Sequence, residues 1–441
     1  MKLKLILSVL CLSFLFCSCG EDELPVVGNE DGTNNNNNGG GSGIVTTLNL
    51  RDFGADNTGA KDCSEAFKKL FAAMGQDQQV EVFIPAGRYK IAQRVVFDQS
   101  NFEGYDNNHG LMFRGAGEDV TEIICDNMQG GFYFNAGTSR ITVTVQDISF
   151  VTPQDNAGTA IEFNTKGQNP GDQHARMFQV RNVLIRGEKF DKGYFTNGIL
   201  CYNAWYPMLE NVKITGRYGG GTYKMNRGVL FEKCYSPLVD KFYFWGNATY
   251  GLYYHGGFES FYPEDGIIDN SYFVGQENGI YIDLSGLDVW YEPAFHLTNT
   301  HVAYSRNGIY MRGLRQAFIT SNLFYCQNVA GSYWHGNTDP PASYEPRDVF
   351  CDRASDVLIA NNQFMEPASP KRVCVDIGSA SSNIVIQNNI FNMDATAIRN
   401  QSTAVSYALY NVFGGSPSFI GSGGFVKYND LTGTLKIVDY P

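Results

Sequence analysis

Short stretches of alternating apolar and polar residues recur through most of the chain, and each opens with a small or turn-forming residue. One group begins with glycine, as in Gly279-Ile-Tyr-Ile-Asp, where the two isoleucines share one side of a strand. A second group begins with a polar residue, most often asparagine. Between Asn182 and Asn299 its members follow one another at steps of 29, 30, 29 and 29 residues. Each stretch predicts a short strand between turns.

The two groups run together along the sequence, which indicates a repeated structural unit. The glycine group comprises Gly198, Gly228, Gly251, Gly279, Gly308 and, less cleanly, Gly331. The polar group comprises Asp147, Asn182, Asn211, Lys241, Asn270, Asn299, Asn322, Asn362, Asn389 and Asn411. Asparagine tolerates the left-handed turn conformation, and stacked asparagine side chains can bond to one another. The pattern predicts a parallel β-helix, since propeller blades need about 40–45 residues, more than most steps here.

Four segments near the start of the repeats resemble a known superfamily. They are residues 50–55 (LRDFGA), 62–71 (DCSEAFKKLF), 82–89 (VFIPAGRY) and 113–117 (FRGAG). Together with the coils behind them, from about Thr46 to the C-terminus, they resemble the pectate-lyase-like superfamily. The resemblance implies an all-β fold, a single-stranded right-handed parallel β-helix solenoid with an N-terminal capping helix. It leaves the reaction open, because lyases, hydrolases and phage tailspikes share these segments.

Residues 64–74 have the amphipathic pattern of such a helix, with Asp62 or Ser64 as its N-cap and Gly75 as its end. The helix would cover the first coil, which otherwise presents an unpaired strand edge. We therefore expect residues 44–441 to form the β-helix domain, in which residues 44–130 are the N-terminal cap and lead-in segment.

The first 43 residues have the composition of a targeting segment and a linker. A basic start is followed by an apolar stretch that ends at Cys17-Ser18-Cys19. Residues 1–18 therefore resemble a bacterial lipoprotein signal, with Cys19 as the acylated residue. An ordinary signal peptide cleaved elsewhere is the alternative. The Gly-Glu-Asp-Glu of residues 20–23 resembles the export tag of Bacteroidetes lipoproteins, which implies an outer-membrane lipoprotein exposed at the cell surface. The Asn- and Gly-rich composition of residues 19–43 predicts a flexible tether.

Composition and charge exclude several classes of protein. Of the 441 residues, 43% are hydrophobic and 18% charged, which excludes a disordered chain. The formal net charge of −12 argues against nucleic-acid binding, because no net basic field exists to displace counterions. Seven of the ten cysteines lie beyond Cys19, and without zinc-binding spacing they predict buried thiols. We expect a monomer.

The outward positions of the glycine group carry the candidate chemistry. The first and third residues after each glycine are mostly aliphatic, so the second and fourth residues must point out of the coil. With neighbouring strands about 4.8 Å apart, these positions stack into two adjacent ladders. The second positions include Tyr253, Tyr281, Tyr310 and Tyr333, and the fourth positions include Glu232, His255, Asp283, Arg312 and His335.

Such ladders fit a saccharide-binding groove, because aromatic faces take up the apolar sides of sugar rings while charged groups hold hydroxyls and carboxylates. A tyrosine ladder that only stabilises an exposed sheet is the alternative. Flanking loops add a basic wall, which includes Arg306, and an aromatic and acidic wall, which includes Trp290. A local positive field suits an anionic polysaccharide despite the net charge. Pectic chains and glycosaminoglycans are both open.

Uronic-acid chains are cleaved by β-elimination when the carboxylate is neutralised, the C5 proton is removed and the leaving oxygen is protonated. The residues expected to catalyse these steps are His255, Tyr281, Tyr310, Arg312 and His335. The residues expected to bind substrate are Glu232, Tyr253, Asp283, Arg306, Tyr333 and Trp290. A tyrosine can act as the base if Arg312 and His335 lower its pKa. The sequence thus predicts a polysaccharide lyase.

Two other functions would use the same residues. Glu232 and Asp283 stand two strands apart, about 9.6 Å, near the upper end of the range for an inverting glycoside hydrolase. The Asp-Asp and Gly-His-Gly motifs of polygalacturonases are absent, so the hydrolase ranks second. A non-catalytic surface glycan-binding protein is the third function. Many β-helix lyases use Ca²⁺, and Asp265, Asp283 and Glu292 are candidate ligands, but without a spacing motif no metal is assigned.

Overall fold

The computed structural model describes residues 45–74, 79–99, 110–137, 141–166, 177–218, 223–256, 264–286, 294–325, 345–365, 371–392, 395–404, 406–414, 418–421, 425–428 and 436–438. These residues fall within one structural unit, Gly43–Pro441. Within these ranges, no helix combines the length and the apolar character that a membrane span requires.

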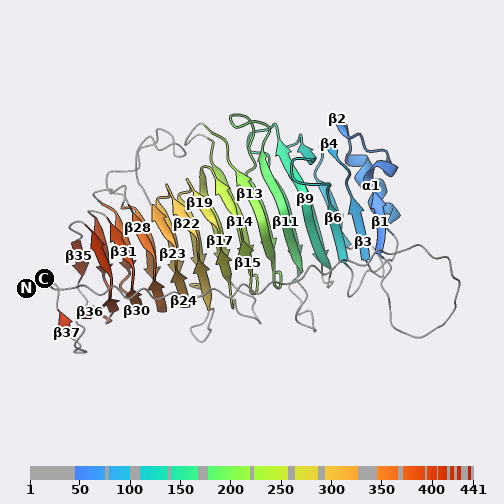
Figure 1. Ribbon diagram of the computed structural model, residues 1–441. Helices are drawn as coiled ribbons and strands as arrows, with labels where there is room; N and C mark the ends of the chain where they lie inside the picture. Colours follow the sequence, from blue (N-terminus) through green and yellow to red (C-terminus); the bar gives the residue numbers. More distant parts are fainter. Residues whose placement is uncertain are drawn as a thin grey trace, which may run out of the picture. The chain divides into compact units, whose positions relative to one another are not determined.

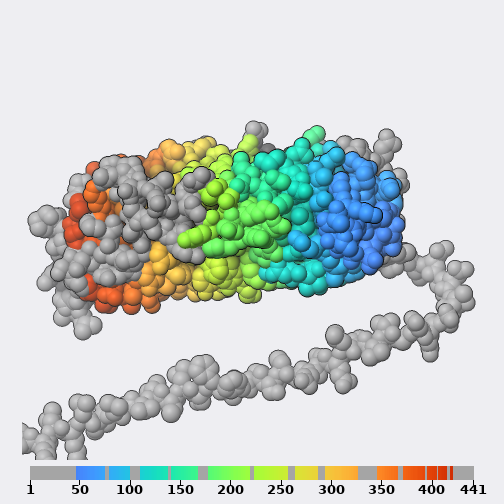
Figure 2. Space-filling view, turned by 90° about the horizontal axis from the view of Figure 1, so that it is seen from above, coloured from blue at the N-terminus to red at the C-terminus, as the bar shows by residue number. Residues whose placement is uncertain are grey.

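Parallel strands wind into successive coils that stack in chain order, as the progression of colours in Figures 1 and 2 shows. One strand of each successive coil joins a 12-stranded sheet. The strands of this sheet are β5 (Val95–Asp98), β8 (Gly130–Gly137), β10 (Thr159–Thr165), β12 (Asn197–Tyr202), β14 (Met225–Glu232), β17 (Ala248–His255), β20 (Asn278–Asp283), β23 (Asn307–Arg312), β26 (Arg347–Asp352), β29 (Val373–Ile377), β32 (Thr396–Asn400) and β35 (Ser418–Gly421). It contains the strands that begin around Gly198, Gly228, Gly251, Gly279 and Gly308, while Gly331 lies outside the described residues.

The other strands form a larger sheet of two columns, and three long strands run through both: β9 (Thr142–Thr152), β11 (Phe178–Gly187) and β13 (Met208–Thr215). The first column adds β1 (Val45–Asn49), β3 (Gln79–Phe83), β6 (Gly110–Arg114), β15 (Leu238–Asp240), β18 (Ile267–Asp269), β21 (Phe295–Thr298), β24 (Arg315–Thr320), β27 (Ser355–Ala360), β30 (Ser382–Gln387), β33 (Ser406–Leu409), β36 (Phe425–Tyr428) and the antiparallel β37 (Lys436–Val438). The second column adds β2 (Thr58–Asp62), β4 (Gly87–Ile91), β7 (Thr121–Cys125), β16 (Tyr243–Trp245), β19 (Tyr272–Val274), β22 (His301–Ala303), β25 (Leu323–Tyr325), β28 (Gln363–Met365), β31 (Ile390–Asn392) and β34 (Val412–Gly414). The predicted fold class, a right-handed parallel β-helix, is confirmed.

The chain bends between the two columns at a residue in the left-handed conformation. In the N-terminal coils this residue is the predicted polar one, since Asn182 and Asn211 have φ values of 51° and 50°. Asn211 Nδ2 donates to Asn182 Oδ1 at 3.0 Å, and Asn182 Nδ2 donates to Asp147 Oδ1 at 2.8 Å. The predicted asparagine turn and the bonding along its column are confirmed in these coils.

From Asn322 onward the asparagines of the polar group lie one position further along and point into the coil, which corrects the single predicted column. The left-handed residue there is the preceding one, for example Ser321 or Asn361. Asn322 and Asn362 are almost fully buried. The backbone N–H and Nδ2 of Asn322 donate to Asn362 Oδ1 at 2.9 and 3.0 Å, and Asn362 donates to Asn389 in the same way. These groups form a buried polar ladder whose hydrogen bonds are satisfied.

Inward side chains of the 12-stranded sheet contribute to one continuous apolar core. Ile280 and Ile309, the first residues after their glycines, have no exposed surface. The glycine itself lies where strands of neighbouring coils pack closely. A Cβ on Gly251 would lie 2.3 Å from the carbonyl oxygen of Gly279 and 2.7 Å from the ring of Phe273. The predicted inward and outward positions of these strands are confirmed.

Helix α1 (Ser64–Ala73) lies at the N-terminal end of the coils, after the short 3-10 helix η1 (Leu50–Phe53) (Figure 1). The N-cap residue is Cys63, whose side chain makes no capping hydrogen bond, so the predicted N-cap, Asp62 or Ser64, is wrong. Asp62, one residue earlier, accepts hydrogen bonds at Oδ1 from the Ser64 N–H and hydroxyl at 3.0 and 2.6 Å. Phe67 and Phe71 of α1 are buried, and Phe67 meets Phe132 of β8 edge-on at 5.5 Å. The predicted helix is confirmed, while its predicted end, Gly75, lies outside the described residues.

Candidate functional site

The outward side of the 12-stranded sheet carries the tyrosine ladder. We call the outward residues of β14, β17, β20, β23 and β26 the tyrosine face. Tyr253 lies opposite Tyr281 in the neighbouring strand, and Tyr281 lies opposite Tyr310. The rings of Tyr281 and Tyr310 stack with centroids 4.7 Å apart, and Tyr253 meets Tyr281 edge-on at 5.2 Å. Three of the four predicted ladder tyrosines therefore lie in register on one face.

Tyr250 extends this aromatic surface, although it is not part of the predicted ladders. It precedes Gly251 on β17 and stacks on Tyr253 with centroids 4.8 Å apart. Strand alternation alone could not have found it, because residues 250 and 253 are three positions apart and a regular strand would place them on opposite faces; the burial pattern of β17 shows that the alternation is interrupted at Gly251.

The polar ladder runs beside the tyrosines in the predicted order. Glu232 lies opposite His255, and His255 lies opposite Asp283. His255 Nδ1 is 2.9 Å from each carboxylate oxygen of Glu232, and the His255 ring lies 5.5 Å from the ring of Tyr253. When Nδ1–H donates to Glu232, the other ring nitrogen, Nε2, holds a lone pair. This pair can therefore present a neutral imidazole that accepts a proton.

Arg312 is shared between carboxylates on the strands either side of it. Its Nη1 is 3.4 Å from Asp283 Oδ2, and its Nε is 3.4 Å from Asp352 Oδ2. The neighbouring Asp283 raises the pKa of Arg312. Asp283 also accepts a hydrogen bond of 2.6 Å from the Ser285 hydroxyl. The charge of Arg312 is thus partly compensated within the protein itself.

The ladder tyrosines are held in their protonated form. Burial, assisted by nearby carboxylates, raises the pKa of Tyr253 and of Tyr310 to about 12. The Tyr310 hydroxyl donates to Asp352 Oδ2 at 3.2 Å, which stabilises the protonated form further. Burial and Asp283 also raise the pKa of Tyr281, against the opposing effect of Arg312. The prediction that nearby cations lower a tyrosine pKa is therefore wrong, and these hydroxyls stay protonated, which rules them out as the base.

The strand next to Tyr310 differs from the one expected. β26 pairs with β23 so that Phe350 lies opposite Tyr310 and Asp352 lies opposite Arg312. The prediction that Tyr333 and His335 occupy these two positions is wrong. The residues whose expected roles fall outside the described residues are Tyr333, His335, Trp290 and Cys19.

A buried ion pair explains why the glycine pattern failed at β26. Asp348 stands at the glycine position of this strand, and neither it nor Arg372 has exposed surface. Arg372 Nε and Nη2 donate to the Asp348 carboxylate at distances between 2.7 and 3.1 Å. An aspartate is accommodated at this inward position because an arginine from the following coil neutralises it.

Most of the cations expected to form an open basic wall have carboxylate partners. Arg306 Nη1 lies 3.1 Å from Glu277 Oε1, and Lys224 Nζ lies 3.0 Å from Glu277 Oε2. Arg217 is paired with Asp155. Most of the predicted wall is therefore neutralised locally, and the substrate-binding role of Arg306 stays a prediction.

No metal centre is assigned from the described side chains. Among them, no three His, Cys, Asp or Glu residues come close enough together to hold an ion. Of the candidate Ca²⁺ ligands, Asp265 and Asp283 are described and Glu292 is not. Six cysteines of the described ranges are free and buried, as predicted: Cys63, Cys125, Cys201, Cys234, Cys351 and Cys374.

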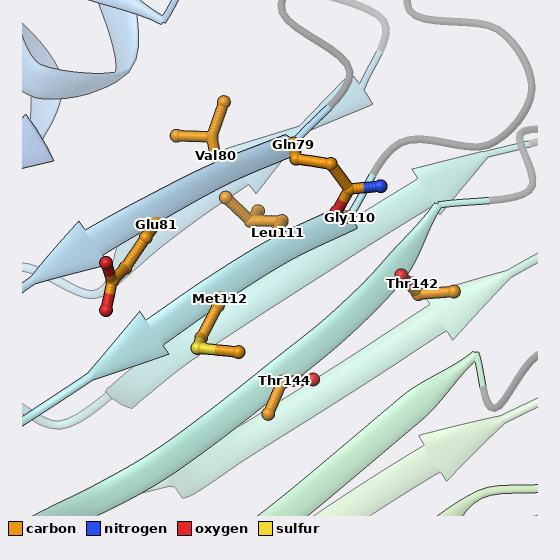
Figure 3. Close-up of a pocket in the computed structure, with 8 residues that line it drawn as sticks. All are labelled: Gln79, Val80, Glu81, Gly110, Leu111, Met112, Thr142 and Thr144. Atoms are coloured by element: carbon orange, nitrogen blue, oxygen red, sulfur yellow. The ribbon is translucent and has the colours of Figure 1, made fainter. Parts of the chain in front are cut away.

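A separate hollow of about 320 Å³ lies on the larger sheet, over β3, β6 and β9 (Figure 3). It is lined by Gln79, Val80, Glu81, Gly110, Leu111, Met112, Thr142 and Thr144. The Glu81 carboxylate already accepts a hydrogen bond of 2.9 Å from the Thr47 hydroxyl and pairs with Arg114. Because this hollow lies on the other sheet, it is distinct from the tyrosine face.

The family profile described as Rhamnogalacturonase A/epimerase, pectate lyase-like matches residues 47–331. The chain belongs to this family. The match extends from the first strand through the coils of β14, β17, β20 and β23, and it confirms the superfamily resemblance seen in the sequence. No curated protein matches the chain.

Solved structures similar to this family member have distant sequences. The A-module of a mannuronan C-5 epimerase from Azotobacter vinelandii is 16% identical with a TM-score of 0.50, over 85% of this chain and 97% of that chain. The catalytic domain of a family GH87 α-1,3-glucanase, in complex with tetrasaccharides, is 14% identical with a TM-score of 0.56, over 85% and 67% of the two chains. At such identities the similarity shows a shared fold.

Proposed function

We propose that the chain is a polysaccharide lyase that cleaves a uronic-acid-containing, anionic polysaccharide by β-elimination at the tyrosine face. The observation that carries this proposal is the His255–Glu232 pair, a base held at one nitrogen beside protonated tyrosines. In the reaction the base takes the C5 proton, and the C–H electrons form the C4–C5 double bond. The C4–O bond breaks, and the leaving oxygen receives a proton.

His255 is the proposed base. Glu232 accepts from its Nδ1–H, which fixes the tautomer with a lone pair on Nε2 and stabilises the imidazolium formed when the proton arrives. The side chain of His255 is 44% exposed, so substrate can reach it.

Tyr253 is the proposed donor of the proton to the leaving oxygen, because it is protonated and adjoins His255. Tyr281 and Tyr310 continue the stacked surface on which saccharide rings lie, and their hydroxyls are alternative donors. Arg312 holds Asp283 and Asp352 in place at the edge of this surface.

The names of the similar proteins support the choice of a polysaccharide as substrate. One structure belongs to a mannuronan C-5 epimerase and another to an α-1,3-glucanase. An epimerisation at C5 begins with the same proton abstraction as β-elimination and differs in returning a proton to C5, so it is one outcome of the test below.

A glycoside hydrolase is the second candidate, favoured by the two carboxylates that flank His255. Glu232 and Asp283 lie on the strands either side of it, about 9.6 Å apart at ordinary strand spacing, where inverting hydrolases use about 6.5–9.5 Å. Asn337-Thr338-Asp339 matches a polygalacturonase motif but lies outside the described residues. In this chain, however, both flanking carboxylates have cationic or histidine partners.

The test is incubation of the protein with polygalacturonate, alginate, glycosaminoglycans and neutral glucans. Ultraviolet absorbance of unsaturated uronate and new reducing ends are followed in parallel, and a parallel reaction in D₂O is examined by NMR for exchange at C5. We expect absorbance and reducing ends to rise together on an anionic polymer. The variant His255→Ala should lose about 100-fold or more of the rate, as expected for a general base.

The control is His296→Ala, because His296 lies on β21 of the larger sheet, where it stacks on Phe318. Reducing ends without absorbance would establish hydrolysis instead. C5 exchange without chain cleavage would establish epimerisation. Binding without turnover would leave a glycan-binding protein, and wild-type rates in His255→Ala would remove His255 from the reaction.

We further propose that residues 1–18 direct export, that acylated Cys19 anchors the protein in the outer membrane, and that residues 20–43 tether the solenoid at the cell surface. The basis of this proposal is the composition of these residues, which lie outside the described ranges.

A further inference from the structure

Four arginines occupy outward positions within the described strands of the 12-stranded sheet, and they differ in their partners. Arg312 pairs with Asp283 and Asp352, while Arg347 and Arg399 both pair with the buried Asp376. Arg227 on β14 is the exception. No carboxylate among the described residues forms an ion pair with it. Its Nε is buried without a hydrogen-bond partner, as are those of Arg312 and Arg347, so the missing carboxylate is what sets Arg227 apart.

Arg227 lies at the edge of the aromatic surface. Its strand neighbours are Asn197 on β12 and Tyr250 on β17. Its guanidinium carbon is 5.7 Å from the centroid of the Tyr253 ring. Its charge also reaches Tyr202, the ladder neighbour of Glu232, where it opposes the rise in pKa that burial causes. The positive charge therefore lies at the β12 side of the tyrosine face, next to the Tyr253 ring.

Tyr253 lies between Arg227 and the proposed base. Along each strand, the position of Arg227 precedes that of Tyr253, which in turn precedes that of His255. The Tyr253 ring is 5.7 Å from the guanidinium carbon on one side and 5.5 Å from the His255 ring on the other. A uronate carboxylate is bonded directly to C5, so a carboxylate at Arg227 belongs to a different sugar residue from the one that reacts at His255.

The ligand that best complements the uncompensated guanidinium of Arg227 is a carboxylate. The guanidinium offers planar N–H donors that match the two oxygens of a carboxylate, and such charge-assisted pairs are among the stronger hydrogen bonds. The adjacent Tyr250 and Tyr253 rings supply a surface for the sugar ring that carries the carboxylate.

We propose that Arg227 binds the carboxylate of the uronate residue next to the one cleaved, and so selects the acidic form of the polymer. This inference rests on the proposed function, since it places Arg227 one subsite away from His255. Arg227 is a recognition residue, and it does not touch the reacting atoms.

The test measures binding of the full chain to polygalacturonate, alginate and hyaluronan by calorimetry, with methyl-esterified polygalacturonate as the uncharged comparison. Binding is measured in the His255→Ala background, so that turnover does not consume the polymer. Arg227→Gln is expected to weaken binding of the acidic polymer by at least about tenfold and to leave the methyl ester unaffected. Arg227→Lys keeps the charge without the planar fork and is expected to lose less affinity.

Arg315→Gln is the matched control, because Arg315 lies on β24 of the larger sheet and pairs with Asp356. Unchanged affinity of Arg227→Gln for the acidic polymer would overturn the inference, and so would a wild type that binds the methyl ester as tightly or binds none of the acidic polymers. If Arg227→Gln does not fold, Arg227→Lys is the deciding variant: unchanged affinity for the acidic polymer and unchanged acid preference would overturn the inference. If Arg227→Gln loses the preference for the acidic polymer and the wild type shows no lyase activity, the role of Arg227 in binding a carboxylate stands while the proposed function is overturned.

Discussion

His255 and His301 belong to neighbouring coils but have opposite surroundings. His255 is partly exposed and bonded to Glu232. His301 on β22 lies between Tyr272 and Tyr325, with ring centroids 5.8 and 5.6 Å away, and its Nε2 is buried without a hydrogen-bond partner. Burial lowers the pKa of His301 below its ordinary value of 6.5. One histidine is therefore available for proton transfer, whereas the other is a neutral ring in an aromatic stack.

The buried histidine predicts a loss of stability in acid. The unfolded chain takes up a proton at His301 near the ordinary pKa of 6.5, while the folded chain resists it. Acidification below that value therefore favours unfolding. We expect the Tm of His301→Phe to fall less than that of the wild type between about pH 7.5 and about pH 5. Tyr272→Phe, whose hydroxyl does not titrate in this range, serves as the control, and equal losses in wild type and His301→Phe would contradict the prediction.

At the scale of strands and turns, the sequence was sufficient to predict which side chains point inward wherever one face of a strand is aliphatic. Ile280 and Ile282 alternate with Tyr281 and Asp283 on β20, so the inward and outward sides followed from the pattern alone. The same alternation repeats in β17 and β23, and the ladder from Tyr253 to Tyr310 was therefore predictable.

The orientation of the asparagines was harder to predict, because the same residue type occupies the left-handed turn in some coils and an inward position in others. Asn299 occupies the left-handed turn, and Thr300 and Val302 point inward. Asn322 itself points inward together with Phe324. The distinguishing sign is whether the apolar core residues lie an odd number of positions after the asparagine, as Val302 does, or an even number, as Phe324 does.

The site was incompletely predictable because several partners come from other coils. Nothing in the sequence around Arg312 shows that Asp283 and Asp352, on the strands either side of it, share its charge. The pairing of Asp348 with Arg372 likewise joins two coils, and it replaces a glycine that the repeat leads one to expect. Such pairs depend on which strands become neighbours, and the length of the loop between those strands is not fixed by the repeat.

A pair of variants on one strand tests the register of β20. Ile280→Asp should cost about 4 kcal/mol or more, because it places an unpaired charge in the core, and this is a large part of the ~5–15 kcal/mol that stabilises a domain. Tyr281→Asp places the same charge outside, near the Arg312 cation, and should fold. Denaturant unfolding followed by circular dichroism measures both. A stable Ile280→Asp together with an unfolded Tyr281→Asp would mean that the two faces are reversed.

Across the whole molecule, acidic residues outnumber basic ones by 45 to 33, yet the cations near the candidate site are not evenly compensated. Lys224 and Arg306 share Glu277, whereas Arg227 has no described carboxylate partner. A negative protein can therefore still present a positive point to an anionic polymer, at short range where salt screens least.

The location of the protein is a property of the whole chain, and the proposed anchor makes it depend on Cys19. We expect Cys19→Ala to move the protein from the membrane fraction to the soluble or secreted fraction, because a lipid anchor requires that thiol. Immunoblotting of fractionated cells measures the change, with Cys63→Ala, which alters a buried thiol of the folded body, as the control. Retention of Cys19→Ala in the membrane fraction would contradict the anchor.

Each strand of the tyrosine face bonds only to the strands of the coils before and after it. Duplication of the genetic segment for one coil, such as the 29 residues from Asn270 to Thr298, would therefore insert a complete step into the solenoid without remodelling its core. The accommodated length of glycan would grow by about 4.8 Å with each inserted step. Evolution could in this way lengthen or shorten the glycan that fits along the sheet while the chemistry proposed at His255 stays the same.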